Sequence, residues 1–472
     1  MPSFVRHAVI AVGGLLATVV VGIIAVIALN APAPLPRLAA GDTLPGASKW
    51  DWSKLPADSR VTARDGAPLT YRLYPGRPDR AVVLVHGSSG ASNSMHHLAQ
   101  SLQSAGATVY AISLRGHGGS GAVNGDVSYK RQLDDDLADF VTAAGLDRPG
   151  VHRTLIGFSS GGGFTLRQAS GANRGLFDAY LSISPFIAQD APTTQPNAGG
   201  WASVAVPRLI ALSVLDGFGL PLFQGLPVVR FATEAKAGDE RTPVYSYRLV
   251  AAMHLDRRWR EQIAAIDRPT IVAVGANDEL FKAQEFAPLF KQLNPRIAVS
   301  VQSGLGHMDM IADDRAVAAV AGLWQRLANS GRFDLKVRED FFAGLDGDKE
   351  AFDRALKLID KTADIAVLLD AKNRIADVSL VRSELALMGC ERWLGKAMTD
   401  VVTPESVGKI QELIQACRED ADSHWRHVNH PVPGMEDVAI QYTGMVLDKA
   451  GQLLLLGRDM QAVALLQRRL VE

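Results

Sequence analysis

Between about residues 60 and 330 the sequence alternates short apolar runs with longer amphipathic segments, and no other feature restricts the fold as much. The short runs are rich in β-branched residues, as strands buried on both faces of a parallel sheet are. The longer segments carry apolar residues at helical spacing and often end near glycine. The short runs are AVVLVHG, TVYAISLRG, RTLIGFS, AYLSISP, TIVAVGAND and IAVSVQSG, and the helical segments are SMHHLAQSLQSAG, YKRQLDDDLADFVTAAG and FKAQEFAPLFKQL. We therefore expect an α/β fold with a doubly wound, mostly parallel sheet.

The chain has 472 residues, which exceeds the roughly 250 to 300 residues of a single core, so it should contain more than one domain. Prolines, glycines and scattered aromatic residues interrupt the alternation at about 187–268, where we expect an inserted lid. The alternation stops at the segment ANSGRFD, which reads as a linker, and we place a boundary near residue 331. The expected organisation is a transmembrane anchor over 1–30, a Pro-rich tether over 31–59, the α/β domain over 60–330 and a C-terminal α+β domain over 333–472.

Charge and cysteine content exclude several classes of protein. The 49 Lys and Arg residues nearly balance the 50 Asp and Glu residues, giving a formal net charge of -1. Such a chain has no overall positive field to attract a nucleic-acid backbone, so we expect no nucleic-acid partner. The two cysteines, Cys390 and Cys417, are too few for a disulfide framework or a Cys-rich metal site.

The segment AVIAVGGLLATVVVGIIAVIALN, residues 8–30, contains no charged residue. It is long enough for a helix that crosses a hydrocarbon layer of about 30 Å. A cleaved signal peptide is the alternative, but its apolar region is only about 7 to 15 residues long and a small-residue cleavage site should follow. We expect a single-pass membrane anchor. The few basic residues around it, Arg6 before and Arg37 and Lys49 after, leave the side of the membrane open.

The pentapeptide GFSSG, residues 157–161, directly follows an expected strand and precedes an expected helix. It fits the G-x-S-x-G nucleophile elbow, in which a strand turns straight into a helix and exposes a serine hydroxyl. Glycines suit this turn because the strained nucleophile leaves no room for side chains beside it. A loop that is simply rich in Gly and Ser is the alternative. The strand-turn-helix context favours Ser159 as a nucleophile.

A serine nucleophile needs a general base, and the base needs a third group that fixes its tautomer. In this motif's chain order the acid and then the histidine follow the serine. Asp278 follows the strand TIVAVGA and His307 follows the strand IAVSVQSG, so both should lie at the carboxyl edge of the sheet. Asp278 could also cap a helix, which is compatible with a catalytic role, and Glu279 is the alternative acid. His254 lies in the expected lid and is the less suitable base.

A glycine turn, HGSSG at residues 86–90, follows the strand AVVLV. Such a turn can aim backbone N–H groups at a developing oxyanion. We expect the donors to be the amides of Ser88 and Ser160, and His86 to be structural.

The set HGSSG, SLRGHGGS, GFSSGG, GANDELF and GLGHMD resembles the α/β-hydrolase superfamily over about residues 60–328, especially its monoacylglycerol-lipase and lysophospholipase-like branch. The resemblance implies a triad of Ser159, Asp278 and His307 that hydrolyses carboxylic esters without a metal or an organic cofactor. Relatives commonly have Asp where Ser113 opens SLRGHG, which leaves the subfamily open. The apolar lid and the expected anchor favour a small-molecule or lipid ester as the substrate. A peptidase or a thioesterase would use the same triad.

The strand and helix order of residues 333–472 resembles a PAS domain. The segments DIAVLLD, WLGK, TPESV and HWRHVNHP are similar to the N-terminal PAS domain of photosynthesis-gene repressors of the PpsR/CrtJ type. DNA binding is not implied, and a sensor or scaffold with an inert hydrolase part is the alternative function for the whole chain. His424, His427 and His430 lie next to prolines in a strand and turn, so we expect no metal site there. A homodimer could form through one face of the last helix, which carries Met460, Val463, Leu466 and Leu470.

Overall fold

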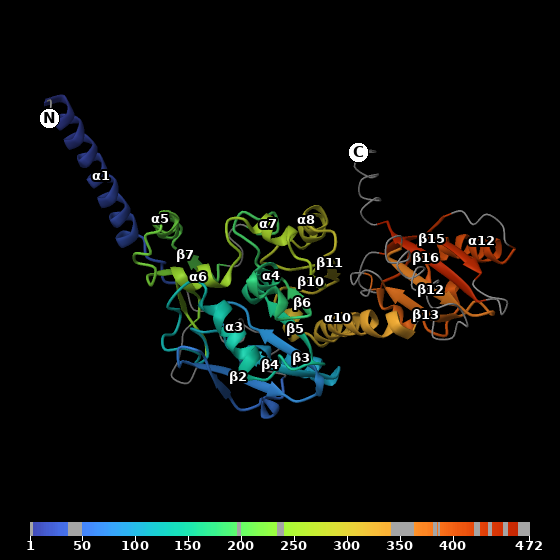
Figure 1. The fold of residues 1–472 in the computed structure, drawn as a ribbon. Coiled ribbons are helices and arrows are strands. Elements are labelled where there is room, and N and C mark those ends of the chain that lie inside the picture. Colours follow the sequence, from blue (N-terminus) through green and yellow to red (C-terminus); the bar gives the residue numbers. More distant parts are fainter. Residues whose placement is uncertain are drawn as a thin grey trace.

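The structure is a computed structural model that describes residues 3–35, 50–195, 200–233, 240–340, 363–380, 385, 388–419, 425–432, 437–446 and 452–460. Figure 1 shows a large α/β unit, which follows the N-terminal helix, and a smaller C-terminal unit built on an antiparallel sheet. The hydrophobic cores of the two units are separate sets of residues: those of the larger unit end at Ala328, and that of the smaller unit begins at Ile365.

An eight-stranded sheet forms the centre of the larger unit. Six neighbouring strands, from β4 (Ala107–Ile112) across the sheet to β11 (Ala298–Gln302), pair in parallel. At the other edge, β1 (Ser59–Thr62) and β2 (Pro68–Tyr74) pair antiparallel, and β2 also pairs antiparallel with β4. The six apolar runs of the sequence coincide with the parallel strands, so the prediction of a mostly parallel sheet is confirmed. In spatial order the strands are β1 (Ser59–Thr62), β2 (Pro68–Tyr74), β4 (Ala107–Ile112), β3 (Arg77–Val85), β5 (His152–Phe158), β6 (Ala179–Ile183), β10 (Thr270–Gly275) and β11 (Ala298–Gln302).

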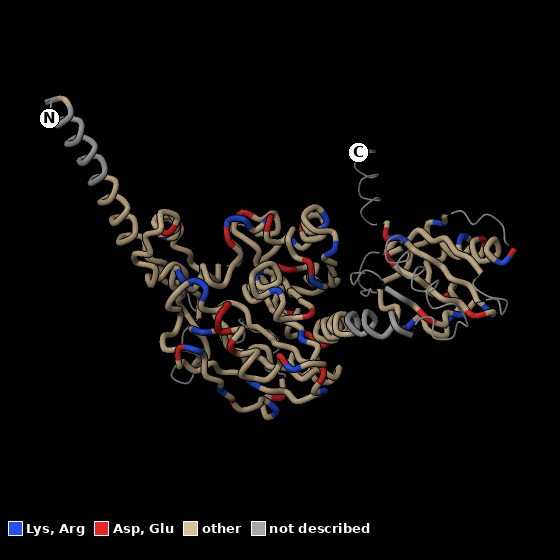
Figure 2. The backbone as a smooth tube through the Cα atoms, in the orientation of Figure 1, with Lys and Arg blue, Asp and Glu red and all other residues tan. Residues whose placement is uncertain are grey.

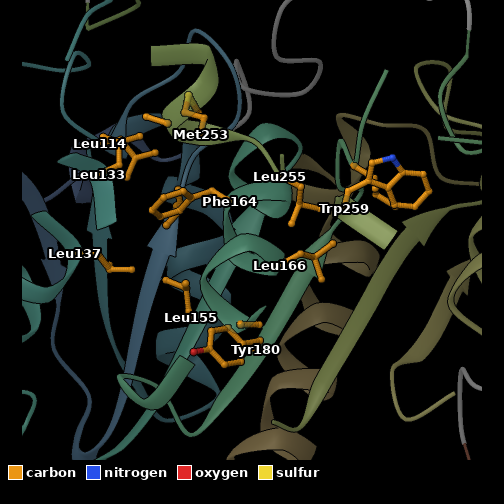
Figure 3. Packing of buried hydrophobic residues seen from close by; sticks show 14 of the residues in the cluster. Leu114, Leu133, Leu137, Leu155, Phe164, Leu166, Tyr180, Met253, Leu255 and Trp259 are labelled. Atoms are coloured by element: carbon orange, nitrogen blue, oxygen red, sulfur yellow. The ribbon is translucent and has the colours of Figure 1, made fainter. Parts of the chain in front are cut away.

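Helices cover both faces of this sheet and bury two separate apolar clusters. One cluster joins the sheet to α2 (His96–Ser104), α9 (Asp309–Ala312) and α10 (Asp314–Asp340). The other cluster joins the opposite face to α3 (Gln132–Ala143), α4 (Ser160–Ser170) and α8 (Phe286–Leu293). Figure 3 shows this second cluster, in which Phe164 and Leu166 of α4 pack among side chains from the strands and from the segment between β6 and β10.

The segment between β6 and β10, where we expected a lid, folds over the second cluster. Tyr245, Leu249 and Trp259 are almost fully buried there. The described elements of the lid are β7 (Ala202–Val204), α5 (Val206–Gly217), β8 (Pro227–Phe231), β9 (Val244–Ser246), α6 (Tyr247–Met253) and α7 (Trp259–Ala264). Strands β7, β8 and β9 form a small antiparallel sheet. The lid is therefore part of the same core as the central sheet.

The expected membrane helix largely coincides with α1 (Ser3–Leu29), and many of the α1 side chains are outside the described set. Within the described residues, none of the helices combines the length and the apolar character that crossing a bilayer requires. The end of α1 contacts the lid, because Ile27 is buried in the second cluster and its carbonyl accepts a 2.7 Å hydrogen bond from Nε of Arg208 on α5. The membrane anchor stays a prediction.

The C-terminal end of the expected tether packs against the larger unit. Trp50 is buried and stacks on His97 at 5.5 Å between ring centroids, and Trp52 stacks on His96 at 5.7 Å. The short 3₁₀ turn Trp52–Lys54 follows directly. Burial of the apolar area of these tryptophan rings packs this segment against the larger unit. The part of the tether at residues 36–49 lies outside the described residues.

The C-terminal unit is a five-stranded antiparallel sheet in the order β13-β12-β16-β15-β14. Its elements are β12 (Ile365–Leu369), β13 (Ile375–Leu380), α12 (Val407–Arg418), β14 (Arg426–His430), β15 (Val438–Val446) and β16 (Leu453–Asp459), with short 3₁₀ turns between β13 and α12. Most of the expected terminal helix, including Val463, Leu466 and Leu470, lies outside the described residues.

One sequence-based expectation about the segment ANSGRFD is wrong. We expected regular structure to end at ANSGRFD, but α10 continues through this segment to Asp340. A glycine inside a helix costs only about 1 kcal/mol relative to alanine, so Gly331 does not by itself end a helix. The connection between the units begins as a helix.

Candidate active site

Ser159 lies in the sharp turn between β5 and α4. Its φ of 57° and ψ of -117° place a non-glycine residue in a strained region of the backbone. Three hydrogen bonds hold it there: its N–H donates to the carbonyl of Ile183 at 2.8 Å, and its own carbonyl accepts from Gly163 at 3.0 Å and Phe186 at 3.1 Å. The turn is thus fixed by neighbouring elements, and the Ser159 side chain is held at the carboxyl end of the sheet.

The glycines of the pentapeptide are required by close packing. A Cβ on Gly157 would lie 2.0 Å from the carbonyl oxygen of Gly161, and one on Gly161 would lie 2.3 Å from the carbonyl oxygen of His86. Real Cβ atoms are not found at such distances from backbone oxygens. Small residues therefore let the strand, the helix and the His86 loop meet around Ser159, which is the steric reason that we gave for the motif.

The structure brings together the three side chains that the sequence singled out. Nε2 of His307 lies 3.0 Å from Oγ of Ser159, and Nδ1 of His307 lies 2.8 Å from Oδ2 of Asp278. The histidine and aspartate side chains are only 2% and 0% exposed. An ionised carboxylate only accepts hydrogen bonds, so the histidine proton belongs on Nδ1. Nε2 is then free to accept the hydroxyl proton of Ser159.

The carboxylates of the two acidic residues at positions 278 and 279 accept hydrogen bonds from different groups. Oδ1 of Asp278 accepts the N–H groups of Leu280 and Phe281 at 3.0 and 2.9 Å, so this carboxylate caps a turn while its second oxygen faces the imidazole. Glu279 instead accepts the backbone N–H of His307 at 2.9 Å. The alternative acid is therefore directed at the main chain of the histidine and not at its ring.

Aromatic rings surround the imidazole of His307. Phe158 and Phe281 lie 4.8 and 5.2 Å from it between ring centroids. Such walls exclude water and lower the local dielectric constant, which strengthens the hydrogen bonds to Ser159 and Asp278. The histidine is also held in one orientation by these contacts.

The loop at residues 86–90 lies beside Ser159. The carbonyl of Gly87 accepts two hydrogen bonds, from Nδ1 of His86 at 2.8 Å and from the N–H of Gly90 at 3.2 Å. In a trans peptide the C=O and the N–H point in opposite directions, so these bonds direct the N–H of Ser88 the other way. Among the described residues, no hydrogen bond uses the N–H of Ser88 or Ser160. Both expected oxyanion donors are thus available to a ligand.

The other candidate groups are placed elsewhere. His254 is the C-cap residue that follows α6, and its ring packs on Phe186. Burial lowers its pKa to about 4. No cluster of metal-ligating side chains occurs among the described residues, a set that excludes His424. Cys390 and Cys417 are not joined in a disulfide, and both are buried in the C-terminal core.

Sequence reasoning missed one part of this site. The N–H of Ser89 donates to the hydroxyl of Tyr245 in the lid at 2.7 Å, and the N–H of Thr242 donates to the carbonyl of Ser89 at 3.0 Å. No motif marks Tyr245, which is one aromatic residue among many in an irregular insertion. Only the long-range contact reveals it.

Known proteins show which family the chain belongs to. The family model Hydrolase_4, described as serine aminopeptidase, S33, matches residues 76–313, which is half of the chain. The monoacylglycerol lipase of Mycolicibacterium smegmatis is 30% identical over 221 residues, or 43% of this chain and 71% of the relative. The chain belongs to this hydrolase family. It is an α/β-fold hydrolase that cleaves esters and is similar to esterases and monoacylglycerol lipases.

The solved structures that this chain matches include an esterase from a Rhodococcus species. It is 20% identical, with a TM-score of 0.42, and the match covers 57% of this chain and 99% of that one. A soluble variant of the monoglyceride lipase of Saccharomyces cerevisiae, in complex with a substrate analog, is 18% identical with a TM-score of 0.44, and the match covers 58% of the hydrolase chain and 95% of the yeast chain.

Proposed function

We propose that this hydrolase is a membrane-anchored serine esterase that uses Ser159, His307 and Asp278 as its catalytic triad. Carboxylic esters of lipids, such as monoacylglycerols or lysophospholipids, are the proposed substrates. The observation that carries the proposal is the continuous chain of hydrogen bonds from Oγ of Ser159 through the imidazole of His307 to Asp278, located at the elbow between β5 and α4.

In the acylation step Oγ of Ser159 attacks the ester carbonyl carbon while its proton moves to Nε2 of His307. The carbonyl electron pair moves onto oxygen, and the N–H groups of Ser88 and Ser160 stabilise this oxyanion. Asp278 stabilises the imidazolium that forms, and it also keeps the ring in the correct tautomer beforehand. Collapse of the tetrahedral species breaks the bond to the alcohol, which leaves with the proton from Nε2.

Deacylation repeats this sequence with water as the nucleophile. His307 takes a proton from water, whose oxygen attacks the acyl carbon, and then returns the proton to Oγ of Ser159. The products are a carboxylate and an alcohol, and the enzyme is regenerated. Each step uses only groups of this chain, with the two backbone donors supplying electrostatic stabilisation that typically changes turnover by about 10²- to 10³-fold per donor.

Two observations support the membrane anchor. The described end of α1 and the lid helix α5 carry few charged residues (Figure 2). The two helices are also joined, because the guanidinium of Arg208 on α5 donates to the carbonyls of Ile27 and Ala28 near the end of α1. Apolar side chains are also exposed on α5 and the loop after it. They are Val206, Ile210, Val214, Phe218, Leu220, Leu222 and Phe223. A bilayer would cover such a surface, which water solvates poorly.

For the C-terminal unit we infer a PAS-like role in sensing or self-association. Its support is the five-stranded antiparallel sheet with α12 packed against β14 and β15. In this proposal the hydrolase unit is active, and the C-terminal unit either regulates its ester turnover or joins two chains in a homodimer. A sensor whose hydrolase part is inert is the competing proposal.

The deciding experiment compares Ser159→Ala with wild type on p-nitrophenyl esters of increasing acyl length, on monoacylglycerol and on a peptide p-nitroanilide. We expect wild type to cleave the esters, to be labelled by a fluorophosphonate probe, and to lose both properties in Ser159→Ala. Ser170→Ala, at the far end of α4, is the matched control. A wild-type chain that resists the probe would support the inert sensor, and preferential cleavage of the anilide would support a peptidase.

Carbonate extraction of membranes would test the anchor, since the proposed protein stays in the pellet.

A further inference from the structure

Ser89, which follows the proposed oxyanion donor Ser88, has an unusual backbone. Its φ of 63° is in the left-handed region, which non-glycine residues rarely adopt. Both of its main-chain polar groups bond to one segment of the lid: its N–H donates to the hydroxyl of Tyr245 at 2.7 Å, and its C=O accepts from the N–H of Thr242 at 3.0 Å. The conformation of this loop therefore depends on an element more than 150 residues away in the sequence.

The hydroxyl of Tyr245 is itself fixed by a second partner. Because its oxygen accepts the N–H of Ser89, its own proton points to Nε2 of His117, 2.6 Å away. Nδ1 of His117 then carries the ring proton and faces the carbonyls of Leu114 and Arg115, both at 3.3 Å. Burial, and then the neighbouring His86, hold the pKa of His117 well below its usual value, so the ring stays a neutral acceptor.

We propose that Tyr245 is a positioning residue for the oxyanion hole, and that the lid thereby completes the catalytic site. Its hydroxyl fixes the N–H of Ser89, and this contact holds the adjacent Ser88 peptide with its N–H directed at the developing oxyanion. His117 acts through Tyr245, because it sets the direction of the hydroxyl proton. The inference rests on the proposed function, since it requires the N–H of Ser88 to be a donor to the oxyanion.

The expected kinetic signature follows from when the oxyanion exists. Negative charge on the substrate oxygen develops only towards the transition state, so a misplaced donor lowers kcat and leaves ground-state binding unchanged. A residue that merely shaped the substrate pocket would change KM. The two roles are therefore separable by steady-state kinetics.

The test is Tyr245→Phe in the full chain, which removes one oxygen atom and keeps the ring. We expect kcat for a p-nitrophenyl ester to fall about tenfold or more, with KM within about twofold of wild type. The matched control is Tyr180→Phe. Tyr180 is also fully buried and its hydroxyl donates to a backbone carbonyl, that of Arg174 at 3.0 Å, but it lies on β6 away from the loop. This control should keep wild-type kcat.

Two further measurements separate positioning from a general loss of structure. The Ki of a trifluoromethyl ketone, which forms an oxyanion on Ser159, should rise by the factor by which kcat/KM falls. His117→Phe should lower kcat less than Tyr245→Phe does, and the double variant should fall no further than Tyr245→Phe alone. If Tyr245→Phe does not fold, the kcat and Ki of His117→Phe test the same contact.

A wild-type kcat in Tyr245→Phe, or a rise in KM without a change in kcat, would overturn the inference. So would additive losses in the double variant. Ser159→Ala is measured alongside. If Ser159→Ala keeps its turnover, the proposed function itself fails. If it is inactive and Tyr245→Phe is normal, only the role of Tyr245 is refuted.

Discussion

The hydrolase unit and the C-terminal unit each bury a histidine whose two ring nitrogens are both hydrogen-bonded, but the partners differ. His307 contacts a carboxylate and a serine hydroxyl. His430 contacts the carbonyl of Val401 at 2.7 Å and the hydroxyl of Tyr442 at 3.1 Å, and it stacks on Trp393. Burial lowers the pKa of His430 to about 4, so its ring stays neutral.

This difference shows what a buried histidine needs in order to act as a base. A carboxylate next to Nδ1 stabilises the imidazolium that proton transfer produces, whereas a carbonyl and a phenol leave a buried positive charge without compensation. His117 in the hydrolase unit has the same kind of partners as His430, a tyrosine hydroxyl and backbone carbonyls. We therefore interpret His307 as the base, and His430 and His117 as histidines that do not act as bases.

The largest expected effect is on turnover. His307→Ala should lower kcat by about 10⁴-fold or more and should add nothing to Ser159→Ala, because members of a triad act as a unit. His430→Ala should leave kcat within about twofold and destabilise the C-terminal unit, since it removes a buried stacked ring and leaves the hydroxyl of Tyr442 unpaired. Ester turnover and pulse labelling of Cys390 and Cys417 in urea measure the two effects. A large loss of turnover in His430→Ala would contradict the comparison.

Acidification should have an intermediate effect, which is on the stability of the two folded units. Burial lowers the pKa of His86 and His254 to about 4 and that of His117 well below its usual value. The unfolded chain takes up protons near pH 6.5, so stability is fully present above that pH and falls as the pH drops towards about 4. Each such histidine lowers the free energy of unfolding by about 1 kcal/mol per pH unit in this window. Among the described residues, three histidines are shifted this far in the hydrolase unit and one, His430, in the C-terminal unit, so the hydrolase unit should lose stability faster.

The two units can be followed separately in the same acid titration. Both cysteines of the chain lie in the C-terminal unit, so thiol labelling after a short jump to alkaline pH reports unfolding of that unit only. Residual ester turnover reports the hydrolase unit. The urea midpoint from turnover should fall further between pH 6.5 and pH 5 than the midpoint from labelling. Equal shifts would mean that the two units unfold as one.

The smallest expected effect comes from removing the C-terminal unit. A chain that ends at Asp340 keeps the whole of α10 and both clusters of the central sheet, none of which shares a residue with the C-terminal core. We expect unchanged kcat and an unchanged thermal midpoint for ester turnover, together with loss of any self-association in sedimentation. A loss of most turnover in a folded truncated chain would show that the C-terminal unit completes or regulates the active site.

Local patterns in the sequence predicted the sheet and the three residues of the proposed triad. Strand runs, the G-x-S-x-G turn, and an acid and a histidine placed after later strands are all short-range signals, because a parallel sheet places the ends of its strands at one edge. The break in the periodicity also coincides with the segment inserted between β6 and β10. The continuation of α10 through ANSGRFD was not predictable in this way, since one glycine is compatible with either a helix or a linker.

Only the tertiary structure decided how burial changes the pKa values of His86, His117 and His254, and what holds the oxyanion loop. Position in the sequence separated His307 from His86 and His254. The lowered pKa values of His86, His117 and His254, however, arise from burial that only folding produces. Likewise, Tyr245 contacts Ser89 because the lid folds back over the carboxyl edge of the sheet. Hydrogen bonds and desolvation act over a few ångströms in space, so residues far apart in the chain acquire these properties only when the fold places them side by side.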